Sequence, residues 1–250
     1  MSLIKSTVDE AVWQAFDHAA PSYDRVSVLQ RQSADFLFQW MIAGDAFKFG
    51  SVFQWADIGT GTGALAKRLI EQQQQVFAID QSPAMLAQLQ SLVGIQTIQA
   101  DMRDLPLLDG SMDHVVSHFA LHWLEPSVLL ELSRIVKSHG MLWLALPVLG
   151  SFATVSARYP QLPIFDFLAA EDWLQQVQSL DVELVSMTQK MWSQPFANLQ
   201  ELLHTLKLMG GHRLGRVREP VPPAQFRAWL RDHKPIALEY QVLYVQLRKR

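Results

Sequence analysis

The chain has 250 residues, of which 49% are hydrophobic and 18% charged, and its formal net charge is −3. This length and apolar content suffice for one enzyme-sized domain with a full core. Because cysteine is absent, disulfide frameworks, thiolate zinc sites and cysteine nucleophiles are excluded. The charge balance argues against a protein that coats nucleic acid, and no run approaches the roughly 20 apolar residues of a membrane helix. We therefore expect a cytoplasmic, single-domain protein over residues 1–250 that binds neither nucleic acid nor membrane.

The N-terminal half alternates between helix and strand patterns. Helices are expected within 7–45, and the apolar run "VFQWADI" at 52–58 predicts a buried strand. A glycine-rich turn, a helix that starts with "GALAKRLI" and a second strand at 75–80 follow. A strand, a helix and another strand in this order predict a parallel pair.

The alternation continues toward the middle of the chain. In "SPAMLAQLQSL", Ser82 is a helix N-cap and Pro83 lies in the first turn. The remaining elements are a strand at 94–101, a strand at 112–121, a helix at 127–138 and a strand at 140–148. This pattern predicts an α/β fold, a doubly wound and mostly parallel Rossmann-like sheet.

The C-terminal part departs from this alternation. Residues 151–180 are rich in proline and mixed in helical character, and we expect an inserted helical cap there. A strand pattern at 181–192 and a helix at 198–211 follow. The closing run "LEYQVLYVQL" at 238–247 predicts an antiparallel edge strand that completes the sheet.

The glycines of "DIGTGTG" lie between the first strand and the first helix of the sheet, where open α/β sheets bind ligands. Gly59, Gly61 and Gly63 permit tight turns and a close approach of the backbone. The helix N-terminus presents free N–H groups to an anion, either a pyrophosphate or an amino-acid carboxylate. Gly59, Gly61 and Ala64 with Asp80 also satisfy the bare dinucleotide pattern, so these residues alone leave NAD open.

Three acids favour S-adenosylmethionine over NAD. Asp57 precedes the first glycine by two residues and is placed to accept from a cationic ligand group or to orient the loop. Asp80 ends the second strand, where a carboxylate can bind both ribose hydroxyls, and Asp101 follows the third, where it can read an adenine amino group. No Tyr-x-x-x-Lys pair of a dehydrogenase is present.

Several segments occur in an order that resembles the class I S-adenosylmethionine-dependent methyltransferases. They are "ADIGTGTG", "AIDQSPAML", "IQADMRDLPLLDGSMDHVVSHFALHWL" and "LSRIVKSHGMLWLALP". The ends, "FDHAAPSYDRVSVLQRQSADFLF", "ELLHTLKLMGGHRLGR" and "LEYQVLYVQLRK", look like the malonyl-acyl-carrier-protein O-methyltransferase family of biotin synthesis. The chain departs from that family at "IGTGTG", where relatives often carry cysteine or proline, and at "GGHRLGRVREP".

The resemblance implies methyl transfer from S-adenosylmethionine to the free carboxylate of a malonyl thioester, carried by an acyl-carrier protein. Another small-molecule acceptor and a noncatalytic cofactor-binding role remain alternatives. A nucleic-acid methyltransferase is disfavoured, because "SHFALHW" stands where an Asn/Asp-Pro-Pro-aromatic run would hold a flipped base. The expected cofactor-binding residues are Tyr23, Asp57, Gly59, Gly61, Gly63, Asp80, Asp101 and Met102.

The implied chemistry needs little acid–base catalysis. A carboxylate with a pKa near 4 is ionised at pH 7, so no general base is required, and catalysis consists of positioning and desolvation. Tyr23 and His118 are possible pocket residues, and Phe119 and Trp123 are weaker candidates. By resemblance, Arg213 and Arg216 read the acceptor carboxyl group.

Three further features complete the sequence-based expectations. His114, His118 and His122 recur at a spacing of four, but they lie in a strand and a loop without thiolate or clustered carboxylate partners, so no metal is expected. Arg31 is either a partner for the methionine carboxylate of the cofactor or an ordinary surface arginine. Residues 191–250 contain 10 Lys or Arg and 4 Asp or Glu, a net +6, which suits either a solvated face or docking of an acidic carrier protein.

Overall fold

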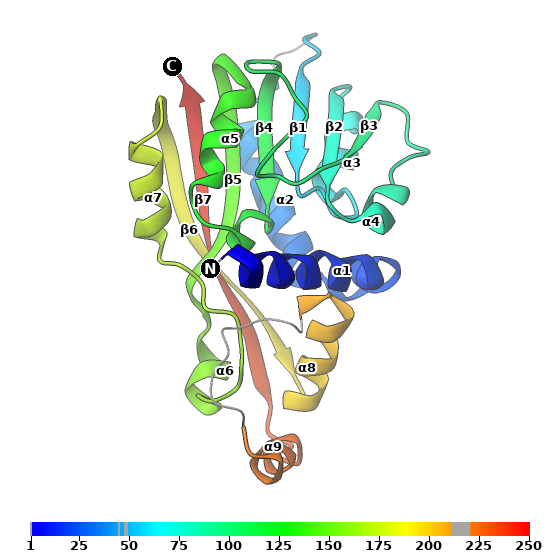
Figure 1. Cartoon of the computed structure of the whole chain (residues 1–250), viewed down its shortest axis with the longest axis vertical. Coiled ribbons are helices and arrows are strands. Elements are labelled where there is room, and N and C mark those ends of the chain that lie inside the picture. Colours follow the sequence, from blue (N-terminus) through cyan, green and yellow to red (C-terminus); the bar gives the residue numbers. More distant parts are fainter. Residues whose placement is uncertain (1, 45, 48–49, 212–220) are drawn as a thin grey trace.

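A computed structural model describes residues 2–44, 46–47, 50–211 and 221–250, with side chains from residue 12 onward. Within these residues, one seven-stranded sheet has the order β3-β2-β1-β4-β5-β7-β6 (Figure 1). The strands are β1 (Gln54–Ile58), β2 (Gln75–Asp80), β3 (Ile95–Gln99), β4 (Met112–His118), β5 (Val136–Phe152), β6 (Val182–Phe196) and β7 (Ile236–Lys249). The first five are parallel to one another, and the last two add antiparallel pairs. The predicted α/β class and mostly parallel sheet are confirmed.

Helices α3 (Ala64–Glu71), α4 (Pro83–Ala87) and α5 (Val128–Ile135) connect the parallel strands. The Ser82 side chain caps α4 by accepting from the Met85 N–H at 3.2 Å, as its sequence position predicts. Both α4 and α5 are shorter than the sequence suggests. The prediction that the α5 helix extends to residue 138 is wrong, because Val136 already pairs with Met112 in the sheet.

The position of the last strand differs from the sequence-based expectation. β7 is antiparallel, as predicted, but it is not at the edge of the sheet, because it lies between β5 and β6 and pairs with both. β6 is the outer strand instead. The two strands pair from Val182 opposite Lys249 to Phe196 opposite Ile236, so this hairpin-like pair extends the sheet well beyond the parallel strands.

Two helices precede the sheet, α1 (Ser2–Val26) and α2 (Val28–Ala43), so the helical region starts earlier than the predicted 7–45. Figure 1 shows α1 lying across the ends of the strands, between the sheet and α8 (Leu199–Leu208). Among the described helices, none combines the length and hydropathy needed to cross a bilayer.

The segment predicted as a cap at 151–180 has two parts: its last helix packs on the sheet, and the residues before that helix line a cavity. Its helix α7 (Ala170–Gln178) packs on the sheet through the fully buried Trp173. Helix α6 (Ala153–Arg158) contacts β7, and the segment after it contributes Phe165 and Leu168 to a cavity described below. The last helix, α9 (Pro223–Leu230), lies at the end of the molecule opposite the C-terminus (Figure 1).

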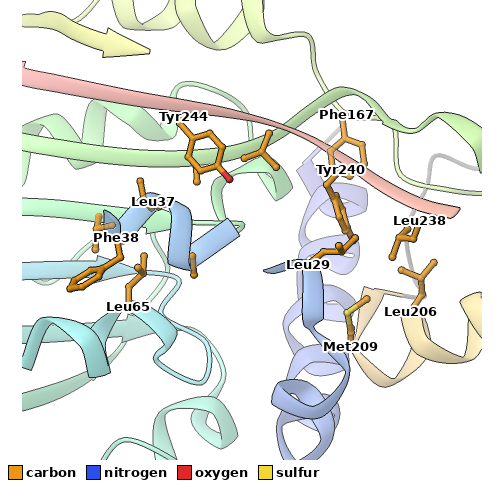
Figure 2. Close-up of a cluster of buried hydrophobic side chains, with 14 of the residues drawn as sticks. Leu29, Leu37, Phe38, Leu65, Phe167, Leu206, Met209, Leu238, Tyr240 and Tyr244 are labelled. Atoms are coloured by element: carbon orange, nitrogen blue, oxygen red, sulfur yellow. The ribbon is translucent and has the colours of Figure 1, made fainter. Parts of the chain in front are cut away.

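Buried apolar side chains form a cluster on each face of the sheet. Helices α2 and α3 cover one face with residues such as Leu37, Phe38 and Leu65, and Figure 2 shows these together with Tyr240 and Tyr244 of β7. Helices α5 and α7 cover the other face. The apolar stripe of each helix thus fixes it against the sheet, and the carboxyl ends of the parallel strands are left for α1 to cover.

Candidate active site

A cavity of about 830 Å³ opens at the carboxyl ends of β1 to β4 and beneath α1. Parallel sheets place their ligand sites at this edge. The glycine loop and the segments after β2, β3 and β4 line one side, and α1, α2 and the segment after α6 line the other. The lining side chains used below are Tyr23, Asp24, Arg31, Thr62, Asp80, Asp101, Met102, Arg103, His118, Phe119, His122, Trp123 and Phe165.

The three glycines of the loop all have positive φ angles, +68° at Gly59, +55° at Gly61 and +81° at Gly63. A Cβ atom on Gly59 would overlap the side chain of Ala120, and one on Gly63 would overlap Leu89. A Cβ atom on Gly61 would meet nothing within 4 Å. Gly59 and Gly61 line the cavity, so the loop backbone approaches a bound ligand most openly at Gly61.

Asp57 lies behind the glycine loop and is buried. Its Oδ2 accepts from Thr60 Oγ1 at 2.7 Å and from the Ala66 N–H at 3.1 Å, which ties β1 to the loop and to the start of α3. Burial raises the pKa of this carboxyl to about 7, opposed by the same two hydrogen bonds. Asp57 does not reach the cavity lining, so the structure favours the loop-orienting role of the two that its position suggests.

Asp80 does line the cavity, at the end of β2. Its carboxylate accepts from the Gly61 N–H and the Ser82 N–H, each at 2.9 Å. Burial raises the pKa of Asp80, and the backbone donors oppose that rise. One side chain thus joins the tip of β2 to the glycine loop and faces the ligand space.

The segment after β3 brings Asp101 and Met102 to the cavity. Asp101 accepts from Arg103 Nε with both oxygens, at 2.9 and 3.0 Å, and this partner lowers the pKa of the carboxyl. The Met102 methyl group lies beside Gly59. An acid and an apolar thioether therefore meet at this end of the cavity, where an amino-bearing aromatic ring would find both polar and apolar partners.

Hydrogen bonds hold helix α1 over the cavity. Asp17 accepts from Ser82 Oγ at 2.7 Å and from the Ala84 N–H at 2.9 Å, and Asp24 accepts from Thr62 Oγ1 in the glycine loop. Tyr23 lies between these two acids in the sequence and lines the cavity; burial raises its pKa above the ordinary tyrosine value, so its hydroxyl stays protonated. Neither Asp17 nor Asp24 was predicted from the sequence, although their seven-residue spacing along one helix was a usable signal.

The three histidines at four-residue spacing do not converge. His114 packs beside Trp55 and accepts at Nδ1 from the Met141 N–H at 3.3 Å, whereas His118 and His122 line the cavity. Burial lowers the pKa of each of these two rings to about 3, so both are neutral. Within the described ranges, no three His, Asp or Glu side chains are grouped around a possible metal position.

A smaller aromatic chamber of about 30 Å³ adjoins the main cavity and shares Tyr23, Phe119 and Trp123 with it. Phe119 contacts Tyr240 of β7 edge to face, with ring centroids 5.1 Å apart. Sequence reasoning missed the other members, since "PIFDF" and the tyrosines of β7 follow ordinary core patterns. Further rings that line this chamber are Phe16, Phe152, Phe165 and Phe167.

Arg31 of α2 lines the cavity, and its Nη1 is buried without a hydrogen-bond partner. A buried and unpaired guanidinium nitrogen is costly, which indicates a place for an anion. From the sequence, Arg31 was open between a partner of the cofactor carboxylate and a surface arginine. The preferred substrate-reading candidates, Arg213 and Arg216, lie outside the described residues.

Residues 56–144, which include the glycine loop, Asp80, Asp101 and His118, match the family described as methyltransferase domain. This part of the chain is similar in sequence to methyltransferase domains. Its resemblance to methyltransferases, inferred above from the order of motifs, is confirmed.

Relatives extend the similarity beyond residues 56–144. Over 247 residues the chain is 28% identical to a protein of Erwinia pyrifoliae named malonyl-[acyl-carrier protein] O-methyltransferase, covering 94% of this chain and 91% of that one. It is 26% identical over 255 residues to the biotin biosynthesis bifunctional protein BioHC of Cellvibrio japonicus, covering 95% of this chain. The chain spans about half the length of that bifunctional protein, 50%.

Solved structures share the fold of most of the chain. The YcgJ protein of Bacillus subtilis superposes with a TM-score of 0.59 at 14% identity, covering 86% of this chain and 99% of that one. A geranyl diphosphate methyltransferase solved in complex with SAM gives a TM-score of 0.54 at 13% identity, with 88% and 85% covered. At these identities the likeness concerns the fold.

Proposed function

We propose that this protein transfers a methyl group from S-adenosylmethionine to the free carboxylate of a malonyl group carried by an acyl-carrier protein. The observation that carries the proposal is a cavity with two unlike sides, acids and open glycine backbone on one and aromatic rings with the neutral His118 and His122 on the other, where the aromatic chamber adjoins it. The name of the Erwinia relative supports the choice of acceptor. The ester product would enter biotin synthesis.

The polar side suits the cofactor. Asp80 is placed to accept from the ribose hydroxyls, and Asp101 and Met102 to hold the adenine ring. Gly61 leaves room for the methionine portion. We assign the methionine carboxylate to Arg31, because the buried, unpaired guanidinium nitrogen there offers a charge-assisted partner.

The aromatic side suits the reacting carboxylate. Methyl transfer needs the carboxylate oxygen, methyl carbon and sulfur in line at about 3 Å, with water excluded. Phe119, Trp123 and Phe165 supply apolar walls. His118 and His122 have pKa values near 3 and are weak bases, and the Tyr240 hydroxyl stays protonated, which agrees with a reaction in which the nucleophile is already ionised.

An acyl-carrier protein is the proposed partner because the C-terminal part of the chain is locally basic. In the described residues, Arg227 and Arg231 lie on α9 or at its end, and Lys234 follows. Arg158 of α6 donates to the Pro235 carbonyl at 2.8 Å, which places a further guanidinium beside this surface. Acidic carrier proteins would be steered to such a surface by complementary charge.

Mass spectrometry tests the proposed reaction directly. Malonyl-carrier protein incubated with the enzyme and S-adenosylmethionine should gain one methyl group, and saponification of the ester should remove it. Acetyl-carrier protein, which lacks the free carboxylate, is the matched control and should stay unmodified. Absence of methyl transfer to the malonyl substrate, or equal transfer to the acetyl control, contradicts the proposal.

A further inference from the structure

Four side chains from four different elements form a continuous hydrogen-bonded chain that ends at the cavity. Trp192 Nε1 of β6 lies 2.7 Å from Tyr244 Oη of β7, which lies 2.7 Å from Ser33 Oγ of α2. Ser33 Oγ in turn lies 3.0 Å from His118 Nε2 at the end of β4. Ser33 and Tyr244 have no exposed surface, 0% each, so water does not offer them other partners.

The direction of this chain follows from the chemistry of its members. An indole N–H only donates, so Tyr244 Oη accepts from Trp192. The Tyr244 hydroxyl hydrogen has one acceptor among the described residues, Ser33 Oγ, and the opposite direction would leave a buried O–H unpaired, which is costly. Ser33 therefore accepts from Tyr244 and donates its own hydrogen to His118 Nε2.

This direction fixes the tautomer of His118. With Nε2 accepting and the ring neutral, the proton is on Nδ1. Nδ1 has no hydrogen-bond partner among the described residues, and the His118 ring lines the cavity beside Phe119, with ring centroids 4.7 Å apart. A single, oriented N–H donor is thus available beside the aromatic chamber.

We propose that the His118 Nδ1–H donates a hydrogen bond to the oxygen of the acceptor carboxylate that does not attack, and that Ser33, Tyr244 and Trp192 are positioning residues that hold this tautomer. The inference rests on the proposed function. One carboxylate oxygen remains free to attack while the other is held, so the group cannot rotate out of line.

The bond changes of the step require no proton transfer. The free oxygen forms a bond to the methyl carbon, the carbon–sulfur bond breaks, and its electron pair stays on sulfur. The negative charge of the carboxylate and the positive charge of the sulfonium are both cancelled, and His118 keeps its Nδ1 proton throughout. A neutral donor withdraws less charge from the attacking oxygen than a cationic one, and it binds the uncharged ester product more weakly than the carboxylate.

Nitrogen-15 NMR of His118 in the ligand-free protein tests the tautomer without any reliance on turnover. We expect the shifts of the Nδ1–H form in the wild type, and a shift toward the Nε2–H form in Tyr244→Phe and Ser33→Ala, with Ser33→Thr restoring the wild-type pattern. Tyr159→Phe is the matched control, because its buried hydroxyl has no partner and its loss should leave His118 unchanged. An Nε2–H ring in the wild type overturns the inference.

Two substitutions of His118 test whether the N–H donor at the Nδ1 position, rather than the imidazole ring as a whole, is what the reaction requires. The amide nitrogen of His118→Asn lies close to the place of Nδ1, whereas that of His118→Gln lies close to Nε2. We expect kcat/KM for malonyl-carrier protein to fall about 10- to 100-fold in His118→Gln and Tyr244→Phe, and less than about 10-fold in His118→Asn. The Kd of S-adenosylhomocysteine should be unchanged in all three.

These outcomes distinguish the inference from the proposed function. If the wild type transfers no methyl group, the proposed function fails and the role of His118 in it fails too, while the NMR shifts still decide the tautomer. If the wild type is active but His118→Gln equals His118→Asn, or Tyr244→Phe equals Tyr159→Phe in turnover, the inference alone is overturned.

Discussion

At the scale of single residues, the three loop glycines all have positive φ angles, but they are required for different reasons. Gly59 and Gly63 are required by packing, since a side chain there would overlap Ala120 or Leu89. Gly61 has open space beside it, and that space belongs to the cavity. Substitution should therefore have different effects at the three positions. Only at Gly61 should a small side chain weaken ligand binding without disturbing the packing of the fold.

We predict that Gly61→Ala folds but binds S-adenosylmethionine at least about 10-fold more weakly, because the added methyl group occupies ligand space. Its left-handed backbone should cost about 1 kcal/mol of the free energy of unfolding. Gly110→Ala is the control: its φ of +57° matches the +55° of Gly61, its nearest atom is at 3.9 Å, and it lies away from the cavity. Calorimetric titration and urea unfolding measure both quantities. Equal binding by the two variants would contradict the prediction.

At the scale of elements, α1 closes the cavity. Its Asp17 supplies two hydrogen bonds to the start of α4, Asp24 binds the glycine loop, and Gln88 donates to the Ala20 carbonyl at 2.8 Å. At the other side, Gly210 packs directly against the backbone of Ala15. α1 is thus held between the loops at the ends of β1 and β2 and α8, and its side chains line the cavity.

Asp17→Ala should loosen α1 and raise the Kd of the cofactor about 10-fold, because it removes two charge-assisted hydrogen bonds. Amide hydrogen exchange in α1 should become faster in the same variant. Asp35→Ala, which removes an ion pair with Arg68 on the outer side of α2, should change neither quantity appreciably, since exposed pairs contribute little. A cofactor Kd that is unchanged in Asp17→Ala would show that α1 does not control access.

At the scale of the whole molecule, charge is distributed unevenly. The net charge of −3 conceals a C-terminal quarter of net +6, and α9 carries part of this charge at the end opposite the C-terminus (Figure 1). Such a separation produces an oriented field around an otherwise acidic protein. The proposed carrier protein would approach from the α9 end.

Charge reversal tests this docking surface. Arg227→Glu combined with Arg231→Glu should raise the KM for malonyl-carrier protein roughly 10-fold at 50 mM salt, with a smaller effect at about 200 mM. Malonyl-coenzyme A, which lacks the acidic protein, should be affected much less. Arg248→Glu with Arg250→Glu makes the same change in net charge at the C-terminal end and serves as the control. If the KM values of malonyl-carrier protein and malonyl-coenzyme A rise equally in the charge-reversed variant, the basic region is a solvated face and not a docking surface.

The two neutral cavity histidines should make stability depend on pH. The folded pKa values of His118 and His122 lie near 3, below the unfolded value of about 6.5, so the unfolded chain binds more protons between these limits. The stabilising effect of the neutral rings is complete above pH 6.5 and declines as the pH falls, by about 1 kcal/mol per pH unit for each histidine. Asp57 acts in the opposite sense over this range, because its folded pKa of about 7 makes the folded state bind more protons. The histidine contribution is therefore measured as a difference: in urea unfolding between pH 7 and 5, the stability of His122→Phe should decline less than that of the wild type, by about 1 kcal/mol per pH unit. Equal slopes of the two proteins would contradict the prediction.

The sequence by itself determined the order of elements, the glycine loop and the acids at the ends of β2 and β3. These features depend on local rules: alternation of apolar runs, the N-cap at Ser82, and the need for backbone freedom at Gly61. A family resemblance then gave an expected cofactor and acceptor. Local pattern also predicted an antiparallel last strand, since β7 has the period and length of a strand.

Only the tertiary structure decided where these elements meet. It placed β7 between β5 and β6, set Asp57 behind the loop rather than in the cavity, and joined Ser33 to His118 across 85 positions of sequence. Strand order and side-chain direction depend on packing between distant segments, which leaves no trace in local periodicity. The aromatic chamber was hidden for the same reason, because a ring that lines a pocket and a ring that fills a core obey the same sequence pattern.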